Sequence, residues 1–151
     1  MPRFFSLCSL VVGVLLAAGG TGVGKQQKAD EITGSWKLVS TTLSGKPIDP
    51  DTALGKTLKG TVKVVTASEI VWSTADEKGK ITRGAWGRYT LKGNDLTITT
   101  DRVVGGPFEP TVGDKKVYNV QIKDGKWYHT AKLENGELSN LQEVWERVEK
   151  K

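Results

Sequence analysis

The chain has 151 residues, with 22 Lys and Arg against 17 Asp and Glu, and with one Cys, one Met and one His. The basic residues are scattered and several alternate with apolar residues, which is typical of the solvent face of strands and argues against a nucleic-acid-binding surface, where basic residues cluster with exposed aromatics. No His, Cys, Asp and Glu residues occur at metal-ligand spacing, so we expect neither a metal nor a cofactor.

The first 24 residues have the pattern of a secretory signal peptide. A positive start precedes an apolar run from Leu7 to Ala18, which is followed by small residues. This run is shorter than the roughly 20 residues of a membrane-spanning helix. We therefore expect an exported protein, periplasmic or extracellular, with no membrane span in the mature chain, and an uncleaved anchor is the alternative. Cleavage also removes the only cysteine, which leaves no disulfide and no thiol nucleophile.

Two further segments follow the signal peptide. Residues 25–32 are polar, lack apolar periodicity and are expected to form a disordered leader. Residues 33–149 are expected to form one domain, because the mature chain of roughly 125 residues suffices for one hydrophobic core.

The signals within this domain are almost all those of β-strands. Alternating segments are found at 35–43, 58–65, 69–74, 84–91, 96–100, 116–123, 126–133 and 141–148. Asp124-Gly125 and Asn135-Gly136 are strong hairpin turns, because these residues tolerate positive φ. The spacing predicts an all-β fold, either a sandwich or an antiparallel up-and-down barrel of about eight strands. The barrel is favoured because an open meander leaves two long edges exposed.

The two ends of the domain resemble a known family. Gly34-Ser35-Trp36 and the terminal Trp145-Glu146-Arg147 resemble lipocalin-like, or calycin-type, barrels, and the chain is similar to uncharacterised lipocalin-like domains of exported bacterial proteins from about Thr33 to Glu149. The resemblance implies that Trp36 packs against Arg147 and closes the barrel. The extra glycine of haem-binding relatives is missing, so haem chemistry is not implied.

The interior of such a barrel either is filled by side chains or holds one small ligand. Strand parity assigns six candidate ligand-binding residues to the interior: Trp72, Tyr89, Tyr118, Trp127, His129 and Trp145. We also expect Glu143 to face inward and to pair with Arg147 or another cation, because an isolated buried carboxylate is costly. Lys63 belongs to the scattered lysines that alternate with valines, a pattern typical of solvent-facing positions.

The leading hypothesis is therefore non-catalytic binding of a small hydrophobic or amphipathic ligand inside the barrel. The alternative is a structural or inhibitor-like module that binds another protein through loops 45–51 and 102–113. No nucleophile or zinc motif is present, so the sequence does not indicate an enzyme. A cavity enzyme that uses His129 is a third and weaker reading.

Overall fold

A computed structural model describes residues 28–105 and 110–149. The elements, in chain order, are α1 (Ala29–Ile32), β1 (Gly34–Leu43), β2 (Lys46–Pro47), α2 (Ala53–Leu58), β3 (Thr61–Val65), β4 (Glu69–Ala75), β5 (Ile81–Lys92), β6 (Asp95–Gly105), β7 (Lys115–Lys123), β8 (Lys126–Lys132) and β9 (Leu138–Arg147). The proposed signal peptide, residues 1–24, lies outside the described residues, as do residues 106–109 of the second loop.

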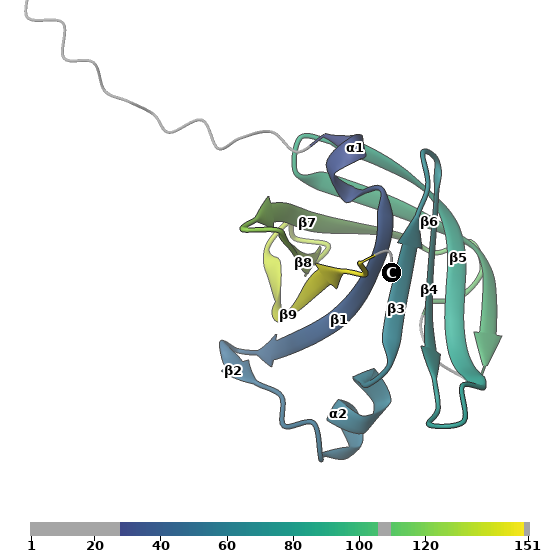
Figure 1. Ribbon diagram of the computed structural model, residues 1–151. Coiled ribbons are helices and arrows are strands. Elements are labelled where there is room, and N and C mark those ends of the chain that lie inside the picture. The colour runs from purple at the N-terminus through teal and green to yellow at the C-terminus, as the bar shows by residue number, and fades with distance from the viewer. Residues whose placement is uncertain (1–27, 106–109, 150–151) are drawn as a thin grey trace, which may run out of the picture.

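The strands form one antiparallel sheet that closes on itself (Figure 1). From β3 to β9 each strand pairs with the next, β1 pairs with β3, and an additional ladder joins β1 to β9. Eight strands thus make the barrel, and the two-residue β2 is only an appendage of β1. The prediction of an all-β, closed, up-and-down barrel of about eight strands is confirmed.

The tight connections have the backbone that their residues favour. Asp124 and Gly125 both have positive φ, 52° and 72°, in the two-residue turn between β7 and β8. Such a turn matches the right-handed twist of the flanking strands. The N-cap of α2, Thr52, accepts a hydrogen bond from the backbone N–H of Gly55 at 3.1 Å.

The leader, expected to be disordered over residues 25–32, contains an ordered turn of helix in the part that the structure describes. Residues Ala29–Ile32 form α1, and the side chain of Ile32 is fully buried in the same hydrophobic cluster as Trp36. The ordered domain therefore starts before Thr33. An isolated isoleucine in a polar segment has no periodicity, so its burial was not visible in the sequence.

Trp36 and Arg147 lie together beside α1. The Arg147 guanidinium carbon is 4.4 Å from the centre of the Trp36 ring, and its two terminal nitrogens donate to the backbone oxygens of Thr33 (2.8 Å) and Glu31 (2.7 Å). The indole nitrogen of Trp36 donates to the Ile32 oxygen at 2.8 Å. These bonds satisfy carbonyls at the end of α1 that have no partner within the helix.

Gly34 makes room for this arrangement. Its φ is +129°, and a Cβ at this position would lie 2.6 Å from Nη1 of Arg147. A larger residue would therefore be strained and would displace the guanidinium. Both defined positions of the Gly-x-Trp sequence are thus explained: Gly34 leaves room for the guanidinium of Arg147, and Trp36 packs against it.

Strand β3 is turned the opposite way to our expectation. Thr61, Lys63 and Val65 face the interior, and Val62 and Val64 are exposed. Lys63 lies opposite Trp36 on β1 and opposite Trp72 on β4. Residues that lie directly opposite each other in a ladder point to the same side of the sheet, so these partners force Lys63 inward.

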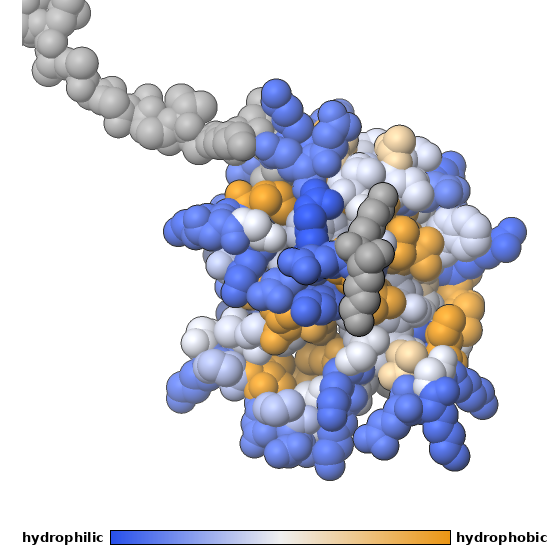
Figure 2. Space-filling model, in the orientation of Figure 1, coloured by the Kyte–Doolittle hydropathy of each residue, from blue (hydrophilic) through white to orange (hydrophobic). Residues whose placement is uncertain are grey.

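The two ends of the barrel differ. Figure 1 shows α1 at one end and α2 at the other. The described interior side chains near α1 include the fully buried Trp36 and Ile32, whereas the leucines of α2 border a cavity. Figure 2 shows that hydrophilic residues project over most of the visible face, with apolar residues between them.

We predict that Arg147→Ala destabilises the barrel by about 2–3 kcal/mol. The change removes a cation–π contact worth roughly 0.5–1 kcal/mol and two hydrogen bonds of about 1 kcal/mol each. Urea unfolding followed by tryptophan fluorescence measures the loss. The matched control is Arg88→Ala, which breaks an exposed pair with Asp101 and should cost clearly less. Equal losses for the two variants would contradict a closure role for Arg147.

Candidate functional site

A cavity of about 330 Å³ occupies the interior on the side of α2. Its apolar walls include Leu38, Leu54, Leu58, Ile70, Trp72, Ala85, Ile98, Tyr118 and Trp145. Its polar lining includes Thr61, Lys63, Arg83, Lys116, His129 and Glu143. An apolar wall with a few convergent polar groups is the usual composition of a small-molecule site, and this volume lies at the small end of the range for such sites.

Lys63 is the centre of the polar lining. Its residue is only 3% exposed, and its Nζ lies 3.8 Å from the centre of the Trp145 ring and 4.5 Å from that of Trp127. The same nitrogen is 2.9 Å from Nδ1 of His129 and 3.9 Å from Oε2 of Glu143. Burial lowers the pKa of Lys63 to about 8, against a smaller opposing effect of the Glu143 charge.

His129 has a defined hydrogen-bonding state while Lys63 is protonated. An ammonium group only donates, so Nδ1 of His129 must accept and Nε2 must carry the ring proton. Burial first, and the nearby charge of Lys63 second, hold the pKa of His129 well below its ordinary value, so the ring stays neutral. Its Nε2 has no hydrogen-bond partner among the described residues. A buried donor without a partner is unfavourable.

Glu143 supplies the negative charge of the cluster. Its Oε2 accepts a hydrogen bond from the indole nitrogen of Trp145 at 3.1 Å and lies within ion-pair distance of Lys63. Glu143 is held opposite His129 in the β8–β9 ladder. We expected it to face inward and to pair with Arg147 or another cation. The cation is Lys63.

Arg83 connects the cavity wall to α2. Its Nη2 donates to the backbone oxygen of Thr57 at 2.9 Å, its Nε donates to the hydroxyl of Thr74 at 3.2 Å, and its guanidinium lies 5.6 Å from the Trp72 ring. Burial is the main cause that lowers its pKa below the ordinary value. The bond to Thr57 fixes the helix against the barrel.

The structure places four of the six candidate ligand-binding residues on the cavity wall: Trp72, Tyr118, His129 and Trp145. Trp127 is fully buried and stacks on His129, with 5.4 Å between ring centres, but it does not border the cavity. Tyr89 also lies away from the cavity, and its hydroxyl donates to the Thr66 oxygen at 2.8 Å. Trp127 and Tyr89 therefore belong to the packed part of the interior.

Sequence reasoning missed Lys63 and Arg83. The only signal for Lys63 was the cross-strand pairing of its strand with Trp36 and Trp72, which requires the register to be known. Gly87 borders the cavity at a bulge, and a Cβ there would lie 2.2 Å from the backbone oxygen of Thr99. It therefore permits close approach of β5 and β6.

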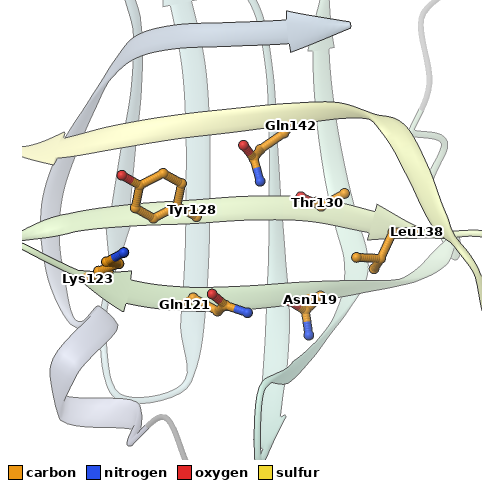
Figure 3. Close-up of a pocket in the computed structure, with 7 residues that line it drawn as sticks. All are labelled: Asn119, Gln121, Lys123, Tyr128, Thr130, Leu138 and Gln142. Carbon is orange, nitrogen blue, oxygen red and sulfur yellow. The ribbon is translucent and has the colours of Figure 1, made fainter. Parts of the chain in front are cut away.

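A second depression, of about 310 Å³, lies on the β7–β8–β9 wall (Figure 3). It is lined by Asn119, Gln121, Lys123, Tyr128, Thr130, Leu138 and Gln142. Along β8, Tyr128 and Thr130 alternate with Trp127 and His129, so this depression lies on the outer face of the sheet. It lacks the ionised, enclosed cluster of the interior cavity.

Within residues 28–105 and 110–149, no group of three or more His, Cys, Asp or Glu side chains is placed to hold a metal ion. Neither α1 nor α2 has the length and apolarity that crossing a membrane requires.

The closed eight-stranded barrel with an interior cavity defines a lipocalin-like fold. In agreement, the structure is similar to that of a lipocalin-like protein from Bacteroides uniformis, with a TM-score of 0.51 and 14% sequence identity over 78% of this chain and 99% of that one. An uncharacterized protein from Bacteroides eggerthii gives a TM-score of 0.48 with 13% identity, over 77% of this chain and 98% of that one. No family model and no curated protein matches the sequence. The resemblance seen in the sequence is thus confirmed for the fold.

The lowered pKa of Lys63 predicts an unusual pH dependence of stability. Above pH 8 the folded chain has released a proton that the unfolded chain keeps until about pH 10.5, so the unfolded state binds more protons and stability rises with pH. Relative to Lys63→Met, the free energy of unfolding of the wild type should gain about 2–3 kcal/mol between pH 7.5 and 10.

Chemical denaturation at a series of pH values measures this difference. The matched control is Lys126→Met, which removes a half-exposed lysine paired with Glu146 and should follow the wild-type profile. Parallel profiles for wild type and Lys63→Met would show that burial does not perturb Lys63.

Proposed function

We propose that this protein binds a small hydrophobic or amphipathic molecule in the cavity and that this binding is non-catalytic. The observation that carries the proposal is the combination of an apolar cavity of about 330 Å³ with a buried cluster of ionised and neutral polar groups on its wall. Apolar residues in place of a buried ion pair often leave the stability of a protein unchanged or raise it, so a filled core does not require this cluster.

The described residues give a ligand two kinds of contact. The aromatic and aliphatic walls bury its apolar part, at roughly 25 cal/mol per Å². The cluster of Lys63, His129 and Glu143 on the cavity wall receives its polar group. An amphipathic molecule is therefore favoured over a purely apolar one.

We further propose that binding takes place outside the cytoplasm. The support is the charged start, apolar run and small residues of the first 24 positions. Binding of another protein through the loops stays a hypothesis from the sequence, because residues 106–109 of the second loop are outside the described part of the chain.

A cavity-filling variant tests the binding site. Ala85 borders the cavity and is 7% exposed, so the larger side chain of Ala85→Leu should occupy the space that a ligand needs. We expect at least a tenfold loss of affinity for octanol, which corresponds to about 1.4 kcal/mol. Binding is measured by the quenching of tryptophan fluorescence, to which the wall residues Trp72 and Trp145 contribute.

The control is Val62→Leu, which adds a methylene group on the outer face of β3 and should bind octanol as the wild type does. Native mass spectrometry of protein purified from its own host provides an independent measurement. A wild-type protein that carries no bound molecule and shows no saturable quenching with octanol or octanoate would refute the proposed function.

A further inference from the structure

Lys63 differs from every other lysine in the described residues. It is the lysine of residues 28–105 and 110–149 that is buried, whereas the others are exposed or half-buried. It is also part of the cavity wall, so its side chain is next to the space that a ligand would occupy.

We propose that the cavity takes small apolar aldehydes or ketones, and that Nζ of Lys63 holds them as a reversible Schiff base. This inference rests on the proposed function, because it names the ligand class of the same site. It adds a covalent step to what would otherwise be binding by burial alone.

The surroundings of Lys63 favour the nucleophilic form of its amine. A lysine amine attacks a carbonyl carbon only when it is neutral. Burial in an apolar pocket lowers the pKa of a lysine, so that more of the neutral amine is present near neutral pH. With a pKa of about 8, roughly a quarter of Lys63 is neutral at pH 7.5, against about one in a thousand for an ordinary lysine. His129 remains uncharged and accepts one N–H at 2.9 Å, which positions the amine.

The covalent step needs no reagent beyond the ligand and water. The ammonium first releases one proton to solvent. The nitrogen lone pair then forms a bond to the carbonyl carbon, and an N–H proton moves to the carbonyl oxygen to give a carbinolamine. Loss of the hydroxyl group as water, with one proton returned from solvent, leaves a protonated C=N bond, so the net products are a protonated imine and one water molecule.

The cluster also suits the protonated imine. This product keeps the positive charge and one N–H on the former Nζ. The charge stays over the Trp145 ring, as it does now at 3.8 Å, with the Glu143 carboxylate as its counter-ion. The remaining N–H still has an acceptor in His129 Nδ1. The apolar part of the aldehyde is then placed among Leu38, Leu58 and Trp72.

Reductive trapping tests the proposal. Intact protein at pH 7.5 is incubated with a slight molar excess of octanal and with cyanoborohydride, which reduces an imine to a stable secondary amine. We expect one alkyl group per chain, mapped by peptide mass spectrometry to Lys63, at least tenfold faster than at any other lysine. The trapping rate should rise with pH and level off above about pH 8.

Three variants make the experiment decisive. Lys63→Arg keeps the positive charge without a nucleophilic amine and should lose trapping, as should Lys63→Met. Lys37→Met removes an exposed lysine of β1 outside the cavity and should leave trapping at Lys63 unchanged. Circular dichroism shows whether each variant is folded, and Lys63→Arg keeps the test valid if Lys63→Met fails to fold.

Octanol and octanoate separate the covalent proposal from the function on which it rests. Saturable octanol binding without preferential trapping at Lys63 would overturn the Schiff base and leave cavity binding intact. The same holds if octanoate binds tightly and octanal is trapped at surface lysines at equal rates, which would indicate a carboxylate ligand. Failure of octanal, octanol and octanoate alike to bind would overturn both.

Discussion

The ladder between β1 and β9 is the contact on which the rest of the structure depends. It pairs Trp36 with Arg147 and Leu38 with Trp145, at opposite ends of the domain sequence. Closure gives both edge strands a partner and creates an inside. Without it, Lys63 would lie on an open sheet in contact with water, its pKa would be ordinary and no cavity would exist. The chemistry of the site is thus a consequence of closure.

The cluster around Lys63 shows which effect prevails inside the barrel. Removal of the ammonium from water is unfavourable, and the two indole rings, the carboxylate of Glu143 and Nδ1 of His129 offset only part of this cost. The pKa of Lys63 is lowered, which shows that the cost of desolvation exceeds the favourable contacts, because a fully compensated ammonium would have kept or raised its pKa. A group with a strongly perturbed pKa that borders a cavity is a candidate functional residue.

Much of the fold could be predicted from the sequence, because strand alternation, the Asp-Gly turn and the two ends of the domain are local features that indicate a closed barrel. The candidate site could be predicted only in part. Trp72 and His129 have unambiguous parity within their strands, whereas the Thr-Val-Lys-Val-Val sequence of β3 has valines on both faces. Which face is inside was decided by the pairing with Trp36, a contact between distant strands. Local periodicity contains no information about such a contact.

The two ends of the barrel have separate physical roles. At the α1 end, Trp36 and Arg147 satisfy backbone carbonyls and fill space, so they determine stability. At the α2 end, Leu58 borders the cavity, and the bond of Arg83 to Thr57 holds its helix. The amine of Lys63 lies over the rings of Trp127 and Trp145, between the two ends of the barrel. Because Lys63 and the leucines of α2 line the same cavity, a ligand of the proposed kind would enter from the α2 side, past α2 itself.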